Sequence, residues 1–203
     1  MEAFLLVTSH REFELSWQRF EDWLAENAPA SHRTLNPPAS PRQVDDAARK
    51  VGTVVPAELR ALLLRHNGAT ETGPQGEFWQ GARFLPYGAS LFTVARIEQH
   101  HQMLTGILDR MPAEQRDTWG RQWWDRRCVP FADTISGDAW IIGGSRPDAV
   151  GQHLDDEGCR FDRWPSLAAM VDDMLSAITG GRPLRTQETP QVVEGRLEWE
   201  SAY

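Results

Sequence analysis

Cysteine is scarce in this chain, whose 203 residues include only Cys128 and Cys159. Two cysteines without a C-x-x-C motif form neither a disulfide-rich scaffold nor a recognisable zinc site. We expect both thiols to be reduced and buried. His100 and His101 are adjacent, so on a helix they point about 100° apart and do not readily share one metal ion. The sequence therefore predicts no metal and no cofactor.

Long apolar runs are also missing. No segment reaches the ~18 apolar residues that a membrane-spanning helix needs. The segment Met1–Val7 is apolar, but it is too short and lacks the basic start of a signal peptide. We therefore expect a cytoplasmic protein that does not enter a membrane.

Basic residues are in the minority, with 21 Lys and Arg against 29 Asp and Glu and a formal net charge of −8. Nucleic-acid binding requires clustered cations, so this balance argues against it. The local exception is Arg116–Arg127, where arginines are interleaved with tryptophans. The stretch has two interpretations: an exposed face that stacks on bases, or a helix that packs on the core. Asp117 and Asp125 interrupt the basic pattern, which favours packing.

Helices with clear ends are the strongest feature present. Ser40, Pro41 and Gln43 predict a capping box that opens a helix ending at Gly52. The next helix is expected to run from Pro56 to Asn67-Gly68, with His66 as a C-terminal cap favoured by the helix dipole. Helical periodicity predicts three more helices, at Glu12–Asn27, Val94–Leu108 and Ser166–Thr179.

Short apolar segments between turn residues predict strands at Ala82–Pro86, Cys128–Phe131, Ala139–Ile142, Val150–Leu154 and Arg160-Phe161. Most of these strands follow one another without intervening helices, which is typical of an α+β domain with an antiparallel meander. Residues 184–191 are interpreted as a polar linker before a turn and a short terminal strand. We expect one domain over residues 1–180, and a linker with a short strand over residues 181–203.

The order and spacing of several motifs resemble the SUKH superfamily and its Smi/Knr family. Trp17–Leu24 followed by Ala28-Pro29 resembles the opening of the family pattern. Leu35–Gly68 resembles its core, from the paired prolines to the closing His-Asn-Gly. Val129–Asp133 with Gly137-Asp138, Leu85-Pro86, and Trp164 before Ser166-Leu167 resemble later family segments, so the resemblance covers about Trp17–Ile178.

The resemblance implies an α+β fold with a mixed, mostly antiparallel sheet flanked by helices, and binding instead of catalysis. Bacterial members look like immunity proteins that neutralise toxins, often nucleases, and fungal members like regulators of cell-wall synthesis. No catalytic residues come with the family. One departure is the Gly143-Gly144 pair, because the family often has an acidic residue at the end of that strand.

Candidate partner-binding residues are tryptophans, which are favoured in interfaces, and acids that attract a basic partner. The loop 69–81 carries Phe78 and Trp79, which either tuck under the loop or form a contact surface. Asp133 and Asp138 bracket a turn and either cap it or contact a partner. The full candidate set is Trp79, Trp123, Trp124, Asp133, Asp138, Asp155, Asp156 and Glu157.

Three functional hypotheses follow. The first is a non-enzymatic, intracellular protein-interaction module, either an immunity protein that binds a basic toxin or nuclease, or a regulator of cell-wall synthesis or signalling. The second is a cysteine-dependent hydrolase that uses Cys128 or Cys159 with a histidine, although no nucleophile motif is present. The third is a nucleic-acid-binding regulator that uses the Arg116–Arg127 stretch. The first is preferred, with no catalytic residues.

Overall fold

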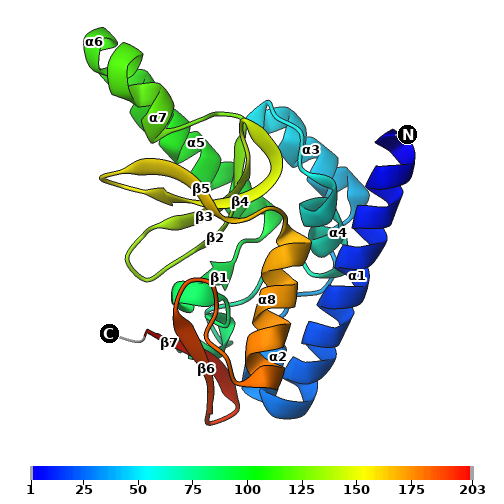
Figure 1. The fold of residues 1–203 in the computed structure, drawn as a ribbon. Coiled ribbons are helices and arrows are strands. Elements are labelled where there is room, and N and C mark those ends of the chain that lie inside the picture. The colour runs from blue at the N-terminus through cyan, green and yellow to red at the C-terminus, as the bar shows by residue number, and fades with distance from the viewer. Residues whose placement is uncertain (1, 202–203) are drawn as a thin grey trace.

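A five-stranded antiparallel sheet forms the centre of the fold in this computed structural model (Figure 1). The structure describes residues 2–201, without the side chains of residues 2–10 and of Arg121, so the side chains of the apolar segment Met1–Val7 lie outside the described part. The strands follow in sequence order: β1 (Ser90–Leu91), β2 (Cys128–Asp133), β3 (Ala139–Gly143), β4 (Arg146–Leu154) and β5 (Gly158–Trp164). All four pairings are antiparallel, and the predicted α+β class is confirmed.

Helices lie on both sides of this sheet (Figure 1). They are α1 (Glu2–Asn27), α2 (Pro29–His32), α3 (Pro41–Val51), α4 (Ala57–Arg65), α5 (Val94–Arg110), α6 (Ala113–Gln115), α7 (Arg121–Trp123) and α8 (Leu167–Gly180). A π-helical turn, η3 (Arg116–Gly120), links α6 to α7, and two 3₁₀ turns are η1 (Gln80–Ala82) and η2 (Pro86–Gly88). No helix within residues 2–201 is long and apolar enough to cross a membrane.

Strand β3 is buried on both faces, which explains its continuous apolar sequence. Trp140 and Ile142 enter a large core shared with α1, α4 and α8. Ala139 and Ile141 enter a smaller core on the opposite face, shared with α5 and α7. Because side chains alternate along a strand, this one strand joins the two cores.

The capping box that opens α3 is confirmed. The Ser40 hydroxyl accepts a bond from the Gln43 N–H at 3.3 Å, and the Gln43 side chain accepts the Ser40 N–H at 2.8 Å. Gly52 ends the helix in the left-handed conformation at φ 73°. These local bonds satisfy backbone groups that a helix end leaves unpaired.

The Leu35–Gly68 motif is structural, because its two ends bond to each other. The Asn36 N–H donates to the Gly68 carbonyl at 3.0 Å, and the Asn67 N–H donates to the Pro37 carbonyl at 3.0 Å. The Asn67 side chain also accepts the Val94 N–H at the start of α5. This short segment therefore ties the entry of α3, the end of α4 and the start of α5 together.

His66 follows α4 as its C-cap residue, as predicted. Its Nδ1 lies 3.0 Å from the Asn36 carbonyl, and its Nε2 lies 3.1 Å from the Glu21 carboxylate on α1. The histidine thus contributes a cross-link between α1 and the core motif in addition to its place at the helix end.

The C-terminal segment corrects one prediction, because part of the expected linker 184–191 belongs to strand β6 (Glu188–Val193), which pairs with β7 (Arg196–Ser201). The hairpin packs on the main core through Leu197 and Trp199, and the Trp199 indole donates to the Phe84 carbonyl at 2.7 Å. Its polar composition hid this strand, because Glu188 is the only buried residue among Glu188–Val193 and no apolar alternation marks it. The division at residue 180 stays a prediction.

The strand expected at Ala82–Pro86 is also wrong. The two 3₁₀ turns η1 and η2 lie at the two ends of this region, where Leu85 forms only an isolated bridge with Ala89, and β1 begins at Ser90. Pro86 has no N–H for a ladder, and Tyr87 adopts a left-handed φ of 60°, so the chain turns here instead of extending.

Candidate protein-interaction site

A groove of about 500 Å³ lies among α2, η1 and the start of β7. We call it the aromatic groove. Three chain segments far apart in sequence contribute its lining, which comprises Ala30, Arg33, Phe78, Trp79, Gln80, Gly81 and Arg196. Trp79, predicted as a partner-binding residue, is therefore in a concave surface.

The two aromatic side chains of the groove differ in exposure. Phe78 leaves 53% of its surface exposed, whereas Trp79 is half-buried and donates its indole N–H to the Glu77 carboxylate at 3.1 Å. The Arg83 guanidinium lies 5.6 Å from the centre of the Phe78 ring and pairs with Glu71 at 2.6 Å. Phe78 is therefore not tucked under the loop, and its role in a contact surface stays a prediction.

Local bonds hold the loop that carries these aromatics. The Trp79 N–H donates to the Glu71 carbonyl at 2.7 Å, and the Gly73 N–H donates to the Glu77 carbonyl at 2.8 Å. The Glu77 carboxylate accepts the Gln75 N–H at 3.0 Å, and bonds from backbone N–H groups, its own first, lower the Glu77 pKa. The aromatic pair is thus presented on an ordered turn.

Gly81 allows the floor of the groove to form. A Cβ at this position would lie 2.5 Å from the Ala30 carbonyl oxygen, which no side chain tolerates. The missing side chain therefore permits the backbones of η1 and α2 to approach closely, and this approach brings Arg33 beside Trp79.

The two arginines of the groove have different electrostatic surroundings. Arg196 lies between Glu194 at 2.7 Å and Glu198 at 3.0 Å, and the Glu194 bond in particular raises the Arg196 pKa. The Arg33 guanidinium has no hydrogen bond or ion pair within the described part of the chain, and it is exposed. Arg33 is therefore the cation of the groove that is available to a partner.

Trp123 and Trp124 are not surface contacts, so that prediction is wrong. They are 4% and 1% exposed, and both belong to the smaller core. The Trp123 indole donates to the Asp155 carbonyl and the Trp124 indole to the Thr105 hydroxyl. Packing on the core, the alternative favoured for Arg116–Arg127, therefore describes this pair of tryptophans.

Arg126 and Arg127 of the same stretch are exposed and paired with acids. Arg126 forms an ion pair with Asp109, and Arg127 forms one with Asp125 at 2.7 Å. The Arg127 hydrogen bonds lower the Asp125 pKa. Residues 123–127 therefore place two tryptophans in the smaller core and two arginines at the surface.

Asp133 and Asp138 lie at the β2–β3 turn with intramolecular partners. Asp138 accepts a bond from the Ser136 hydroxyl at 2.9 Å, and its carbonyl accepts the Thr134 N–H at 2.8 Å. Asp133 pairs with Arg96 of α5 at 3.4 Å. These contacts agree with the turn-capping interpretation, and partner binding by either residue stays a prediction.

Asp155, Asp156 and Glu157 form the exposed tip of the β4–β5 hairpin. We call it the acidic tip. Glu157 forms an ion pair with Arg160, and the Trp123 bond to the Asp155 carbonyl fixes the tip to the smaller core. The structure thus brings the acidic tip together with Trp123, while Trp79 lies in the aromatic groove.

Sequence reasoning missed Arg33 and Arg196 as candidate binding residues, because only the fold brings them to the aromatic groove.

The five-stranded antiparallel sheet with helices on both sides places this protein in the α+β class. The model of the SMI1 / KNR4 family (SUKH-1) matches residues 38–173, and the chain belongs to this family. A curated relative, a KNR4/SMI1 homolog from Eremothecium gossypii, is 29% identical over 83 residues. That alignment covers 41% of this chain and 12% of the relative, so the chain spans a small part of its length.

Proposed function

We propose that this Smi/Knr-type chain is a non-enzymatic module of the cytoplasm that binds a protein partner through the aromatic groove. The observation that carries this proposal is the half-exposed Phe78 beside Trp79 on an ordered loop. Aromatic and arginine side chains dominate the binding energy of many interfaces, and Arg33 adds an unpaired cation. A partner that covers the groove removes apolar surface from water without first having to order the loop.

The finer proposal is an immunity role in which the partner is a basic toxin. The formal net charge of −8 and the exposed acidic tip support it, because complementary charge accelerates the encounter of two proteins. A regulatory role in cell-wall synthesis or signalling is the alternative. The identity of the captured partner discriminates between them: a basic toxin supports the first role, and cell-wall or signalling proteins support the second.

A cysteine-dependent hydrolase has less support. The neighbouring Cys159 thiol and burial raise the Cys128 pKa, which opposes the thiolate that a nucleophile needs. His153, the histidine nearest to either cysteine in sequence, lies opposite Cys159 in the β4–β5 ladder and packs edge-on against the Trp123 and Trp124 rings. His101 bonds the Arg126 carbonyl through Nε2 at 2.9 Å. The surroundings of Cys128 resemble those of a structural thiol, whereas Cys159 is half-buried and its bond with the Cys128 thiol lowers its pKa.

The test is capture of the partner by the tagged 203-residue chain, compared between wild type, Phe78→Ser and Trp79→Ala. We expect each substitution to weaken capture about tenfold or more, as truncation of an interface anchor does. Val54→Ser is the matched control, because Val54 is 80% exposed and outside the groove. Circular dichroism and urea unfolding check the fold. Equal capture by all four proteins would refute a role for the groove.

A further inference from the structure

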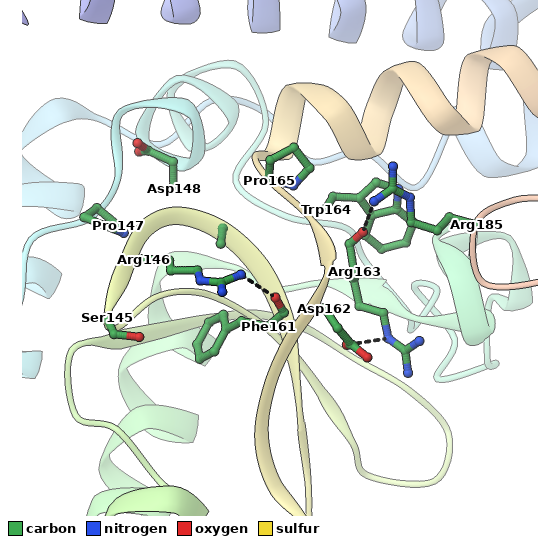
Figure 2. Close-up of a pocket in the computed structure, with 11 residues that line it drawn as sticks. Ser145, Arg146, Pro147, Asp148, Phe161, Asp162, Arg163, Trp164, Pro165 and Arg185 are labelled. Atoms are coloured by element: carbon green, nitrogen blue, oxygen red, sulfur yellow. Dashed lines mark hydrogen bonds and ion pairs between the residues drawn. The ribbon is translucent and has the colours of Figure 1, made fainter.

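A second concave surface of about 660 Å³ lies where β4 begins and β5 ends (Figure 2). We call it the arginine cleft. It is separate from the aromatic groove and shares no lining residue with it. Its walls come from the turn before β4, the end of β5 and the segment after α8, and the residues used below are Arg146, Asp148, Phe161, Asp162, Arg163 and Arg185.

An irregularity in the β4–β5 ladder creates the cleft. Gln152 pairs with Arg160 and Val150 pairs with Trp164, so residues 161–163 lie opposite the single residue Gly151. A Cβ on Gly151 would lie 2.0 Å from the Arg160 carbonyl oxygen, so glycine is required for this close approach. Such a bulge directs side chains out of the regular pleat, and bulges are frequent beside functional sites.

Three guanidinium groups line the cleft in fixed positions. Arg146 donates to the Phe161 carbonyl at 3.3 Å, and Arg185 donates to the Arg163 carbonyl at 3.1 Å. Arg163 donates to the buried Gln152 side chain at 3.1 Å. Each arginine is therefore held by a neutral oxygen, and each retains further N–H donors for a ligand.

The cleft lining holds three arginines and two aspartates, an excess of one positive charge. Arg163 lies 3.5 Å from the Asp162 carboxylate, but Arg146 and Arg185 have no carboxylate partner for their side chains among residues 11–201. The other acid of the cleft is Asp148, and Figure 2 shows its carboxylate turned away from the three guanidinium groups. In a chain of net charge −8, this local excess of cations fits an anionic ligand.

The spread of the cations indicates the kind of anion. Figure 2 shows the three guanidinium groups separated along the cleft, with Arg146 on one side of Phe161 and Arg185 beside Trp164. A single phosphate would need donors that converge on one point. Separate donors in a cleft that is also lined by Phe161, Pro147 and Pro165 suit a chain that carries several carboxylates.

We propose that the arginine cleft binds an extended, carboxylate-rich segment of a protein partner. Successive acidic side chains of that segment bond Arg146 and Arg185, and its backbone passes over Phe161. The inference rests on the proposed function in one respect, namely that the ligand is a protein. The partner's acidic segment is thus recognised at one end of the β4–β5 hairpin, and the protein's own acidic tip lies at the other end.

The test uses a fluorescent peptide of alternating Glu and Ser and a matched peptide with Gln in place of Glu, both titrated with the full chain at low salt. We expect the Glu peptide to bind at least about tenfold more tightly than the Gln peptide, because its carboxylates make charge-assisted bonds. The double variant Arg146→Gln/Arg185→Gln is expected to lose about tenfold in affinity for the Glu peptide. The control Arg42→Gln/Arg49→Gln removes the same charge from the exposed surface of α3 and is expected to bind like wild type.

Equal binding of both peptides, equal loss in the control variant, or no binding would overturn the inference. Displacement of the Glu peptide by inorganic phosphate at a lower concentration than by unlabelled Glu peptide would also overturn it, in favour of a phosphate site. Partner capture separates the two proposals. If the Glu peptide binds but Phe78→Ser does not weaken partner capture, the cleft is supported and the groove is rejected. If Phe78→Ser weakens capture but the Glu peptide does not bind, the cleft alone is rejected.

Discussion

His100 is a histidine whose proton affinity folding lowers strongly. Burial, helped by the nearby charge of Arg96, lowers its pKa from 6.5 to about 4. Its ring packs 5.2 Å from that of Phe92 and is excluded from water. Burial also lowers the pKa of His101 and of His153, so all three imidazoles are neutral in the folded protein near pH 7.

These pKa shifts predict loss of stability in acid. Below pH 6.5 the unfolded chain binds protons on His100 that the folded chain does not, so the free energy of unfolding falls as the pH drops toward 4. Between pH 7 and pH 5 we expect a loss of about 1–2 kcal/mol from His100. Urea unfolding at both pH values measures it. The His100→Gln variant is expected to show a smaller loss, and an unchanged pH dependence would contradict the assignment.

Gly68 is required by both conformation and space. Its φ is 72°, and a Cβ would lie 2.4 Å from the backbone of Phe92. We expect Gly68→Ala to lower the free energy of unfolding by about 2–4 kcal/mol, the range of strained and overpacked substitutions. Gly52→Ala is the matched control, because φ is 73° there and the space is open. Urea unfolding of both variants measures the difference, and equal losses would show that the close approach to Phe92 has no cost.

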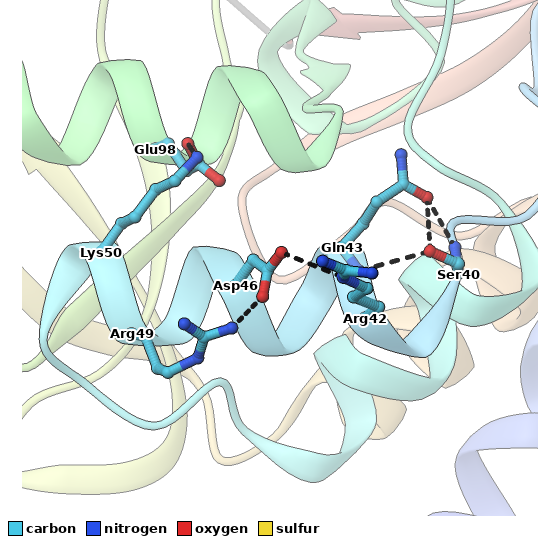
Figure 3. A network of polar contacts seen from close by, with 7 residues as sticks. All are labelled: Ser40, Arg42, Gln43, Asp46, Arg49, Lys50 and Glu98. Carbon is cyan, nitrogen blue, oxygen red and sulfur yellow. Dashed lines mark hydrogen bonds and ion pairs between the residues drawn. The ribbon is translucent and has the colours of Figure 1, made fainter.

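At the scale of elements, α3 shows how local bonds fix a helix. Figure 3 shows Ser40 and Gln43 bonded at its first turn, Asp46 near Arg42 and Arg49, and Lys50 reaching Glu98 on α5. The Lys50–Glu98 distance is 2.7 Å. Such exposed pairs are worth only about 0–1 kcal/mol, so the cap is the stronger local determinant.

The Ser40→Ala substitution tests that cap. It removes the hydroxyl that accepts the Gln43 N–H, and we expect the free energy of unfolding to fall by about 1 kcal/mol. Arg42→Ala on the same turn should change it by less than about 0.5 kcal/mol, because Arg42 only approaches Asp46 to 3.8 Å on the surface. Thermal or urea unfolding measures both. Equal effects would mean that the capping bonds do not stabilise the helix.

Elements were predictable where the sequence carries its own start or stop signal. The capped helices α3 and α8, and the strands β2 to β5 between turn residues, follow from local chemistry. Strand β6 did not, since its stability comes from pairing with β7 and from contacts such as the Tyr87 N–H bond to Glu188. The two concave surfaces could be predicted only in part. The sequence predicts Trp79 as a surface residue, whereas Arg33 and Arg146 become part of a groove or cleft only because distant segments of the chain pack beside them.

At the scale of the whole molecule, net charge shapes how partners approach. The acidic tip projects from a protein whose formal net charge is −8, so a basic partner would be attracted toward it. Glu157 is already paired with Arg160, whereas Asp155 and Asp156 have no ion pair with the side chains that the structure describes. The expected effect of the tip is therefore on the association rate.

Charge reversal at the tip tests this effect. We expect Asp155→Lys/Asp156→Lys to slow association with a basic partner about tenfold at low salt, with little change in dissociation. Glu26→Lys/Glu114→Lys changes the net charge equally at exposed sites elsewhere and separates the local effect from the overall field. Surface-binding kinetics at two salt concentrations give both rates. Equal association rates for the two variants would exclude steering by the tip.

The C-terminal hairpin has a practical consequence for anyone who expresses a part of this chain. The family match ends at residue 173, within α8, and begins at residue 38, after α1 and α2. Yet α1 contributes Trp17 and Phe20 to the main core, and β7 contributes Trp199. A fragment limited to the family match would lack these elements, expose the main core to water and be insoluble. A fragment that includes both α1 and the C-terminal hairpin keeps the main core covered.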